Sequence, residues 1–108
     1  MIFSLQPSAF GLIMFVGICQ IDLIIHNSNS LKEKRQILKA IIERVKNRFN
    51  VSAAEVGDKD VWQRSQIGLS VVGNDSSHIN SMLDKILNFI ESLHLAEVID
   101  HRIEIINY

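Results

Sequence analysis

Apolar and polar positions follow two different periods along this chain, and together they predict four strands and two helices. A period of two marks half-buried strands, and a period near 3.6 marks amphipathic helices. The predicted strands are residues 15–25, 51–56, 66–73 and 96–106, and the predicted helices run from about residue 31 to 49 and from about 76 to 93. The order is therefore strand, helix, strand, strand, helix, strand.

This βαββαβ order predicts an α+β ferredoxin-like sandwich, in which two helices cover one face of an antiparallel four-stranded sheet. Right-handed crossovers fix the strand order as 4-1-3-2. The start of the first helix, the long loop 57–65 and the end of the second helix then lie at one end of the domain. Residues near all three segments are expected to be neighbours.

The chain of 108 residues fits a single domain, which we place at residues 14–108. Residues 1–13 are uncharged and largely apolar, but polar residues and Pro7 interrupt them, so we expect neither a membrane span nor a signal peptide. We interpret this segment as an N-terminal extension from an upstream start. The single cysteine, Cys19, excludes an internal disulfide framework, and we expect a cytoplasmic protein.

Positive charge is concentrated on the first predicted helix, which carries seven of the eleven basic residues between positions 32 and 48. Cations near the helix C-terminus suit the helix dipole and need no partner. Lys32, Lys34 and Arg35 instead follow the capping residue Ser30, where unpaired N–H groups and cations together can bind phosphate. Lys39 and Lys46 lie on the same flank of the predicted helix as Lys32 and Arg35, and they extend this positive surface along the helix. The alternative is a solvated helix face, with Lys34 or Arg35 paired to an aspartate of the loop.

The loop 57–65 is longer than most hairpin loops and contains the only tryptophan. Trp62 could stack on a base, but a tryptophan in a long hairpin more often anchors the loop to the core, and we favour the anchor. Gln63 and Arg64 are then expected to point outward, with Arg64 the best candidate in the loop for contacting a partner.

No catalytic constellation, metal-ligand spacing or phosphate-binding glycine loop is visible in the sequence. We therefore expect no enzyme activity and no cofactor. His101 falls on the inward face of the last strand, together with Ile99, Ile103 and Ile105, and is expected to be a core or edge residue.

Several strings in the chain resemble the bacterial YlxP-like family over roughly residues 14–106. They are Ser-Leu-Lys-Glu-Lys-Arg at 30–35, Arg-Phe-Asn-Val-Ser at 48–52, Ala-Glu-Val at 54–56 and Trp-Gln-Arg at 62–64. The resemblance implies a ferredoxin-like fold. It implies no established activity, and the genes of this family often lie among those for translation initiation and ribosome maturation.

These observations predict a small homodimeric binding protein that associates with RNA or with the ribosome and translation machinery. The candidate contact residues are Ser30, Lys32, Lys34, Arg35, Lys39, Trp62, Gln63 and Arg64. The alternative is a homodimeric protein-interaction module that uses the open, mostly apolar face of the sheet without nucleic acid.

Overall fold

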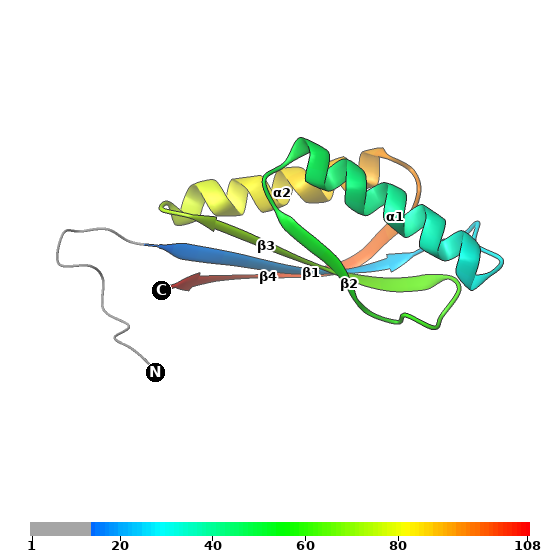
Figure 1. The fold of residues 1–108 in the computed structure, drawn as a ribbon. Helices are drawn as coiled ribbons and strands as arrows, with labels where there is room; N and C mark the ends of the chain where they lie inside the picture. Colours follow the sequence, from blue (N-terminus) through cyan, green and yellow to red (C-terminus); the bar gives the residue numbers. More distant parts are fainter. Residues whose placement is uncertain (1–13) are drawn as a thin grey trace.

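Two helices lie across one face of a four-stranded sheet in the computed structural model, which describes residues 14–108 (Figure 1). The expected extension, residues 1–13, lies outside the described residues. The elements are β1 (Phe15–Ile24), α1 (Leu31–Arg48), β2 (Ser52–Gly57), β3 (Arg64–Gly73), α2 (Ser76–Ser92) and β4 (Glu97–Asn107). Neither helix is long and apolar enough to cross a membrane.

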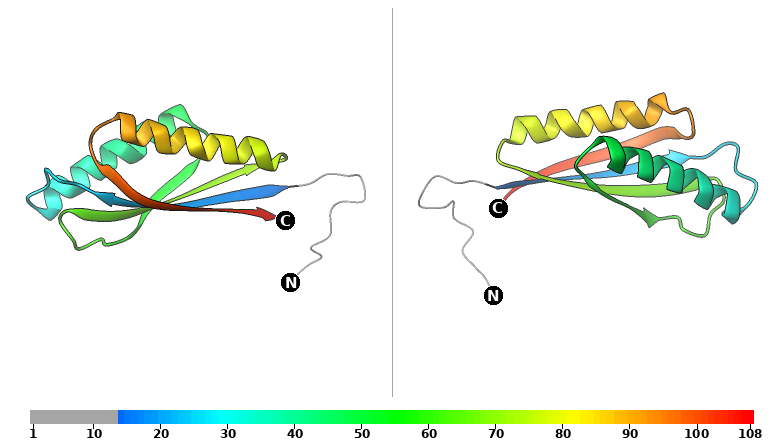
Figure 2. Two further views of the ribbon diagram at one scale, coloured as in Figure 1. Left: turned by 180° about the vertical axis from the view of Figure 1, so that it is seen from behind. Right: turned by 45° about the horizontal axis from the view of Figure 1, so that its top comes forward.

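The strands are ordered β2-β3-β1-β4, which is the predicted order read from the other edge, and neighbouring strands are antiparallel. The predicted ferredoxin-like α+β arrangement is therefore confirmed. Figure 2 shows that the second face of the sheet carries no helix. The two faces of this sheet thus have different surroundings, one packed and one open.

Each helix begins at a side chain that satisfies its free backbone N–H groups. Ser30 caps α1, and the carboxylate of Asp75 caps α2 by accepting from the backbone of Ser77 and His78. Hydrogen bonds from the Ser77 side chain, and then from these N–H groups, lower the pKa of Asp75. The caps explain why both helices start where the polar connectors end.

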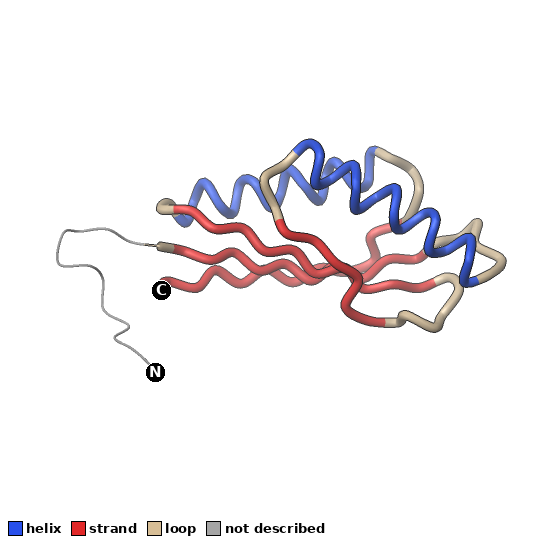
Figure 3. Tube along the Cα trace, in the orientation of Figure 1, coloured by secondary structure: helices blue, strands red, loops and turns tan. Residues whose placement is uncertain are grey.

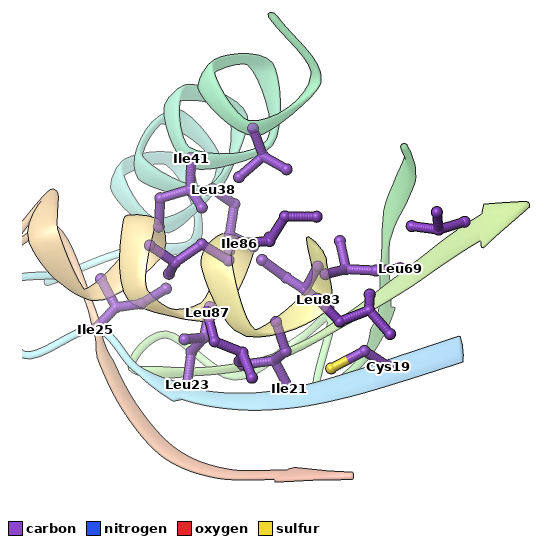
Figure 4. Close-up of a cluster of buried hydrophobic side chains, with 14 of the residues drawn as sticks. Cys19, Ile21, Leu23, Ile25, Leu38, Ile41, Leu69, Leu83, Ile86 and Leu87 are labelled. Atoms are coloured by element: carbon purple, nitrogen blue, oxygen red, sulfur yellow. The ribbon is translucent and has the colours of Figure 1, made fainter. Parts of the chain in front are cut away.

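The core lies between the sheet and the helices (Figure 4). Alternate residues of β1, including Cys19, Ile21 and Leu23, meet the apolar stripes of the two helices. Other members are Ile25, Leu38, Ile41, Val45, Ile67, Leu69, Val71, Ile79, Leu83, Ile86, Leu87 and Ile90. Fully burying an aliphatic side chain stabilises a fold by about 1.5–3 kcal/mol, so this cluster supplies most of the driving force.

The predicted alternation of the last strand is wrong at its beginning, because a β-bulge interrupts the pairing of β4 with β1. Leu23 pairs with Val98 while Asp22 pairs with Asp100, so Ile99 is the extra residue. Val98 therefore packs against the core and Ile99 is exposed. Beyond the bulge, His101 lies opposite Ile21 on this edge strand and is exposed, as an edge residue.

The connector between β1 and α1 and the loop between β2 and β3 lie at the same end of the molecule (Figure 3). The backbone N–H of Ile25, just after β1, donates to the carbonyl of Gln63 at 2.9 Å, which joins the two segments directly. The expected gathering of the start of α1 and the Trp62 loop is thus present.

Candidate functional site

The first turn of α1 is closed by its own side chains. Ser30 Oγ accepts from the Glu33 backbone N–H at 3.1 Å, and the Glu33 carboxylate accepts from the Asn29 N–H at 2.8 Å. This arrangement resembles a capping box, except that the carboxylate accepts from the residue before the cap, and it sets a carboxylate beside the N–H groups of the turn. A phosphate at this position would meet the negative charge of Glu33. Ser30 therefore acts as a cap, and the backbone of this turn is poorly placed to hold an anion.

Lys34 does not lie on the surface. Its side chain is fully buried, and its Nζ lies 3.0 Å from Oε2 of Glu55 on β2. The ammonium also donates to the backbone carbonyl of Asp58 in the β2–β3 loop. The interpretation of an internally paired lysine therefore holds for Lys34, although the paired carboxylate is Glu55 rather than an aspartate of the loop.

One further hydrogen bond extends this pair, and a second joins the neighbouring segments. The hydroxyl of Ser65 on β3 donates to the same Glu55 oxygen at 2.8 Å. Gln63 Nε2 donates to the carbonyl of Ser28 at 3.1 Å, and Ser28 is itself buried. We call these five residues, Ser28, Lys34, Glu55, Gln63 and Ser65, the polar lock. It joins the β1–α1 connector, the first turn of α1, β2 and the β2–β3 loop.

The sequence contains a signal for the burial of Lys34 that the prediction from charge overlooked. Lys34 stands at helical spacing with the buried residues Leu38, Ile41 and Val45, so it fills a gap in the apolar stripe. Glu55 likewise points to the helix side of the sheet, opposite buried Ile67. A lysine and a glutamate at core-facing positions indicate a buried pair, because an isolated buried charge is strongly unfavourable.

Trp62 is not the anchor of its loop, and the favoured interpretation is wrong. Its side chain is 54% exposed. The loop is held instead by the contacts of Lys34 and Gln63, and by a turn in which the Val61 N–H donates to the Asp58 carbonyl at 3.1 Å. Since polar contacts fix the loop, the indole is left facing solvent.

Of the other candidate residues, Lys32, Arg35, Lys39 and Arg64 are exposed. Within residues 14–108, no ion pair involves Lys32, Arg35 or Arg64. Lys39 Nζ lies 3.9 Å from Oε1 of Glu43, one helical turn later. Both side chains are mostly exposed, and such pairs contribute only a few tenths of a kcal/mol to stability. Gln63 points back to Ser28 rather than outward as expected.

Four exposed cations follow one flank of α1, and we call them the basic strip: Lys32, Arg35, Lys39 and Lys46. Their positions fall within a narrow arc of the helical wheel, and they extend along the axis for about 21 Å at the rise of an α-helix. α1 carries seven basic and two acidic residues, whereas the rest of the chain carries four basic and ten acidic ones. The charge of the protein is therefore strongly segregated.

The C-terminal end of α1 needs no ligand to explain its cations. Arg48 lies 5.0 Å from the ring centroid of Phe89 and 6.0 Å from that of Phe49, and these two rings meet edge to face. Lys46 and Arg48 also occupy the last turn, where the helix dipole favours positive charge.

The other titratable groups near the β1–α1 connector and in the core include an exposed pair of a histidine with a glutamate and a buried thiol. His26 Nε2 and Glu97 Oε1 lie 2.6 Å apart, and His26 and His94 line a groove of about 210 Å³. Burial, and then the charge of Asp84, raise the pKa of the Cys19 thiol to about 11, so this thiol stays protonated at neutral pH. Among residues 14–108, no three side chains of His, Cys, Asp or Glu gather as metal ligands do.

Comparison with known proteins identifies the family. The family described as "Protein of unknown function (DUF503)" matches residues 16–103. The chain belongs to this family. The DUF503 match covers all six helices and strands apart from the first residue of β1 and the last four residues of β4, and therefore includes the polar lock and the basic strip.

A relative of this DUF503 chain is the "Uncharacterized protein YlxP" of Bacillus subtilis (strain 168). The two are 42% identical over 77 residues, which cover 71% of this chain and 84% of that protein. The YlxP-like resemblance seen in the sequence is thus confirmed. A solved structure, "De novo designed protein Foldit4", aligns with 88% of this chain and 96% of that one, at 19% identity and a TM-score of 0.46.

Proposed function

We propose that this DUF503 protein is a cytoplasmic binding protein that associates with RNA, in the setting of the ribosome or translation machinery, through the basic strip and the adjacent Trp62 loop. The proposal involves no chemical step. The observation that carries it is the segregation of charge, with most cations on α1 and most carboxylates elsewhere. A nearly neutral protein gains a local anion-binding surface in this way.

The geometry of the basic strip suits a polymer better than a small anion. Its cations are spread over about 21 Å of helix, with no two of them converging on one point. A small anion would contact one or two of them, whereas a phosphate backbone can meet all four in turn. Arg64, in the first position of β3, is a further exposed cation beside the Trp62 loop, but it alternates with buried Ser65 and shares the open face of the sheet with Ser70 and Val72.

The open face of the sheet is a less suitable RNA surface. RNA-recognition motifs stack bases on aromatic side chains of the two central strands. Here the central strands are β1 and β3, and their open-face residues include Ile18, Gln20, Asp22, Ser70 and Val72, none of which is aromatic. The helix flank and the loop therefore remain the better candidates.

The proposal predicts that replacing Lys32 and Arg35 by alanine weakens RNA binding and makes it less sensitive to salt. Each phosphate contact contributes about 0.7 to the slope of log affinity against log salt for a single strand, so two lost contacts lower this slope by about 1.4. Fluorescence anisotropy of a labelled RNA, titrated at several salt concentrations, measures both quantities.

The matched control is the double variant Lys85→Ala with Arg102→Ala. It removes the same charge from exposed positions on α2 and β4, away from the basic strip. Wild-type affinity and slope in the control support a local site. Equal losses in both double variants would mean that only net charge matters, and unchanged binding in the first would refute the proposal.

A second candidate function is self-association through the open face. Ile18, Val72 and Ile106 are 40%, 64% and 42% exposed, and Val16 pairs with both Val72 and Ile106 across the central strands. We call Val16, Ile18, Val72 and Ile106 the apolar patch. Glu104 lies opposite Ile18 at its edge, and a second copy related by a two-fold axis can cover the apolar residues with the same patch.

A further inference from the structure

Trp62 combines two properties that the basic strip does not explain, exposure and rigid support. The exposed fraction of its side chain is 54%, although an indole gains more than almost any other side chain from burial. Its loop is nevertheless held on both sides, by the hydrogen bond of Lys34 to the Asp58 carbonyl and by those of Gln63 with the connector. The indole is therefore presented to solvent by a braced loop.

Preorganisation of this kind favours binding, because a side chain on a fixed loop has less freedom to lose when a ligand arrives. Gln63 is the important neighbour. Its carbonyl accepts from Ile25 and its amide donates to Ser28, so the residue after Trp62 is tied to the connector that leads into α1. The loop that carries Trp62 is thus tied to the connector that precedes Lys32.

The immediate surroundings of Trp62 indicate the class of ligand. Binding hot spots for proteins are enclosed by a ring of further contacts that excludes water. The loop offers few such contacts, since Asp58, Lys59 and Asp60 are charged and exposed and only Val61 beside Trp62 is apolar. A nucleic-acid base needs an exposed aromatic surface for stacking, which the indole supplies, and the cations for its phosphates lie on α1.

We infer that Trp62 stacks on one unpaired base of an RNA strand whose phosphates follow the basic strip. This inference rests on the proposed function and narrows it, because a base can stack on an exposed indole only when it is outside a duplex. The ligand is therefore single-stranded RNA, or a folded RNA with an extruded nucleotide. Stacking is tolerant of sequence, so little base specificity is expected at this position.

The experiment uses the emission of Trp62, which is the only tryptophan in the chain. The probes are a short oligouridylate, a blunt-ended RNA duplex and inorganic polyphosphate, and binding is measured independently by anisotropy competition. We expect oligouridylate to quench the emission with the same midpoint as binding. Polyphosphate and duplex should bind to the basic strip without quenching.

Two variants make the test specific to stacking. Trp62→Leu keeps an apolar side chain but removes the aromatic face, and it should weaken oligouridylate binding at least about fivefold. It should leave polyphosphate binding unchanged, and Trp62→Phe should recover part of the loss. Val61→Ala, at a neighbouring exposed apolar position, is the control and should bind as the wild type does. Circular dichroism confirms that each variant is folded.

The outcomes separate this inference from the function on which it rests. Oligouridylate binding without quenching, and with equal affinity for the wild type and Trp62→Leu, would overturn the stacking while leaving RNA binding in place. If none of the three probes binds, both the stacking and the proposed RNA binding are overturned. Equal quenching by polyphosphate would show that emission responds to charge alone, which also contradicts stacking.

Discussion

The charge of Lys34 is enclosed by the fold, while the cations on either side of it face water. Each step along a helix turns the side chain by about 100°. Within four consecutive positions, Lys32 and Arg35 are therefore exposed while Lys34 is buried. Composition and local charge could not separate these lysines. The position of Lys34 in the apolar stripe of Leu38 and Ile41 distinguishes it from its neighbours, and Glu55 supplies the carboxylate that pairs with it.

The burial of Lys34 predicts a large loss of stability when its charge is removed without that of Glu55. Lys34→Ala should lower the free energy of unfolding by about 3–5 kcal/mol, because it leaves a carboxylate uncompensated in a mostly buried site. Urea denaturation at neutral pH measures this change. The double variant Lys34→Met with Glu55→Gln should recover part of it, since Ser65 keeps an acceptor.

Lys32→Ala serves as the reference for Lys34, because its side chain is exposed and surface substitutions usually stay within about 0.5 kcal/mol. Equal stability of the two single variants would contradict the buried pair.

The helices and strands were largely predictable because each has its own period and its own end signals. Ser30 and Asp75 mark the helix starts, and β1 and β3 alternate cleanly. The exceptions are at the edges of the sheet, where β2 and β4 each carry a bulge against their inner neighbour. A bulge depends on the register of the partner strand, so the pattern of β4 alone placed Ile99 on the wrong face.

The end of α2 provides a test of backbone conformation. His94 follows the C-cap residue Leu93 and has a φ of 54°, in the left-handed region that favours glycine at this position. His94→Gly should therefore be more stable than His94→Ala by up to about 1 kcal/mol. Comparing these two variants by urea denaturation removes the effect of the lost imidazole. An alanine variant as stable as the glycine variant would show that the conformation is unstrained.

The topology of the whole domain followed from the element order and the hand of its crossovers, and that topology brought the start of α1 and the Trp62 loop together. Which candidate residues reach solvent could not be foreseen, because exposure depends on contacts between β2, β3 and α1 that are distant in sequence. Ser30 and Gln63 proved to be engaged in hydrogen bonds to the neighbouring backbone, Lys34 to be buried, and Trp62 to be exposed.

The open face makes a prediction about the assembly of the molecule. If two copies associate through the apolar patch, Val72→Asp should shift the protein from dimer to monomer, because a carboxylate would be buried in the interface. Sedimentation equilibrium over a range of concentrations measures the change. Ser81→Asp adds the same charge on α2, on the other side of the domain, and should leave the dimer intact. A wild-type protein that stays monomeric at high concentration would exclude this assembly.

The polar lock also has a consequence for the rate at which the proposed RNA ligand would associate. Because Lys34 and Gln63 hold the Trp62 loop in the free protein, the proposed binding of RNA requires no loop closure. We then expect the rate of association to be governed by collision and orientation, and to be accelerated by long-range attraction to the cations of α1. Differences in affinity among ligands would appear mainly in how long each complex lasts.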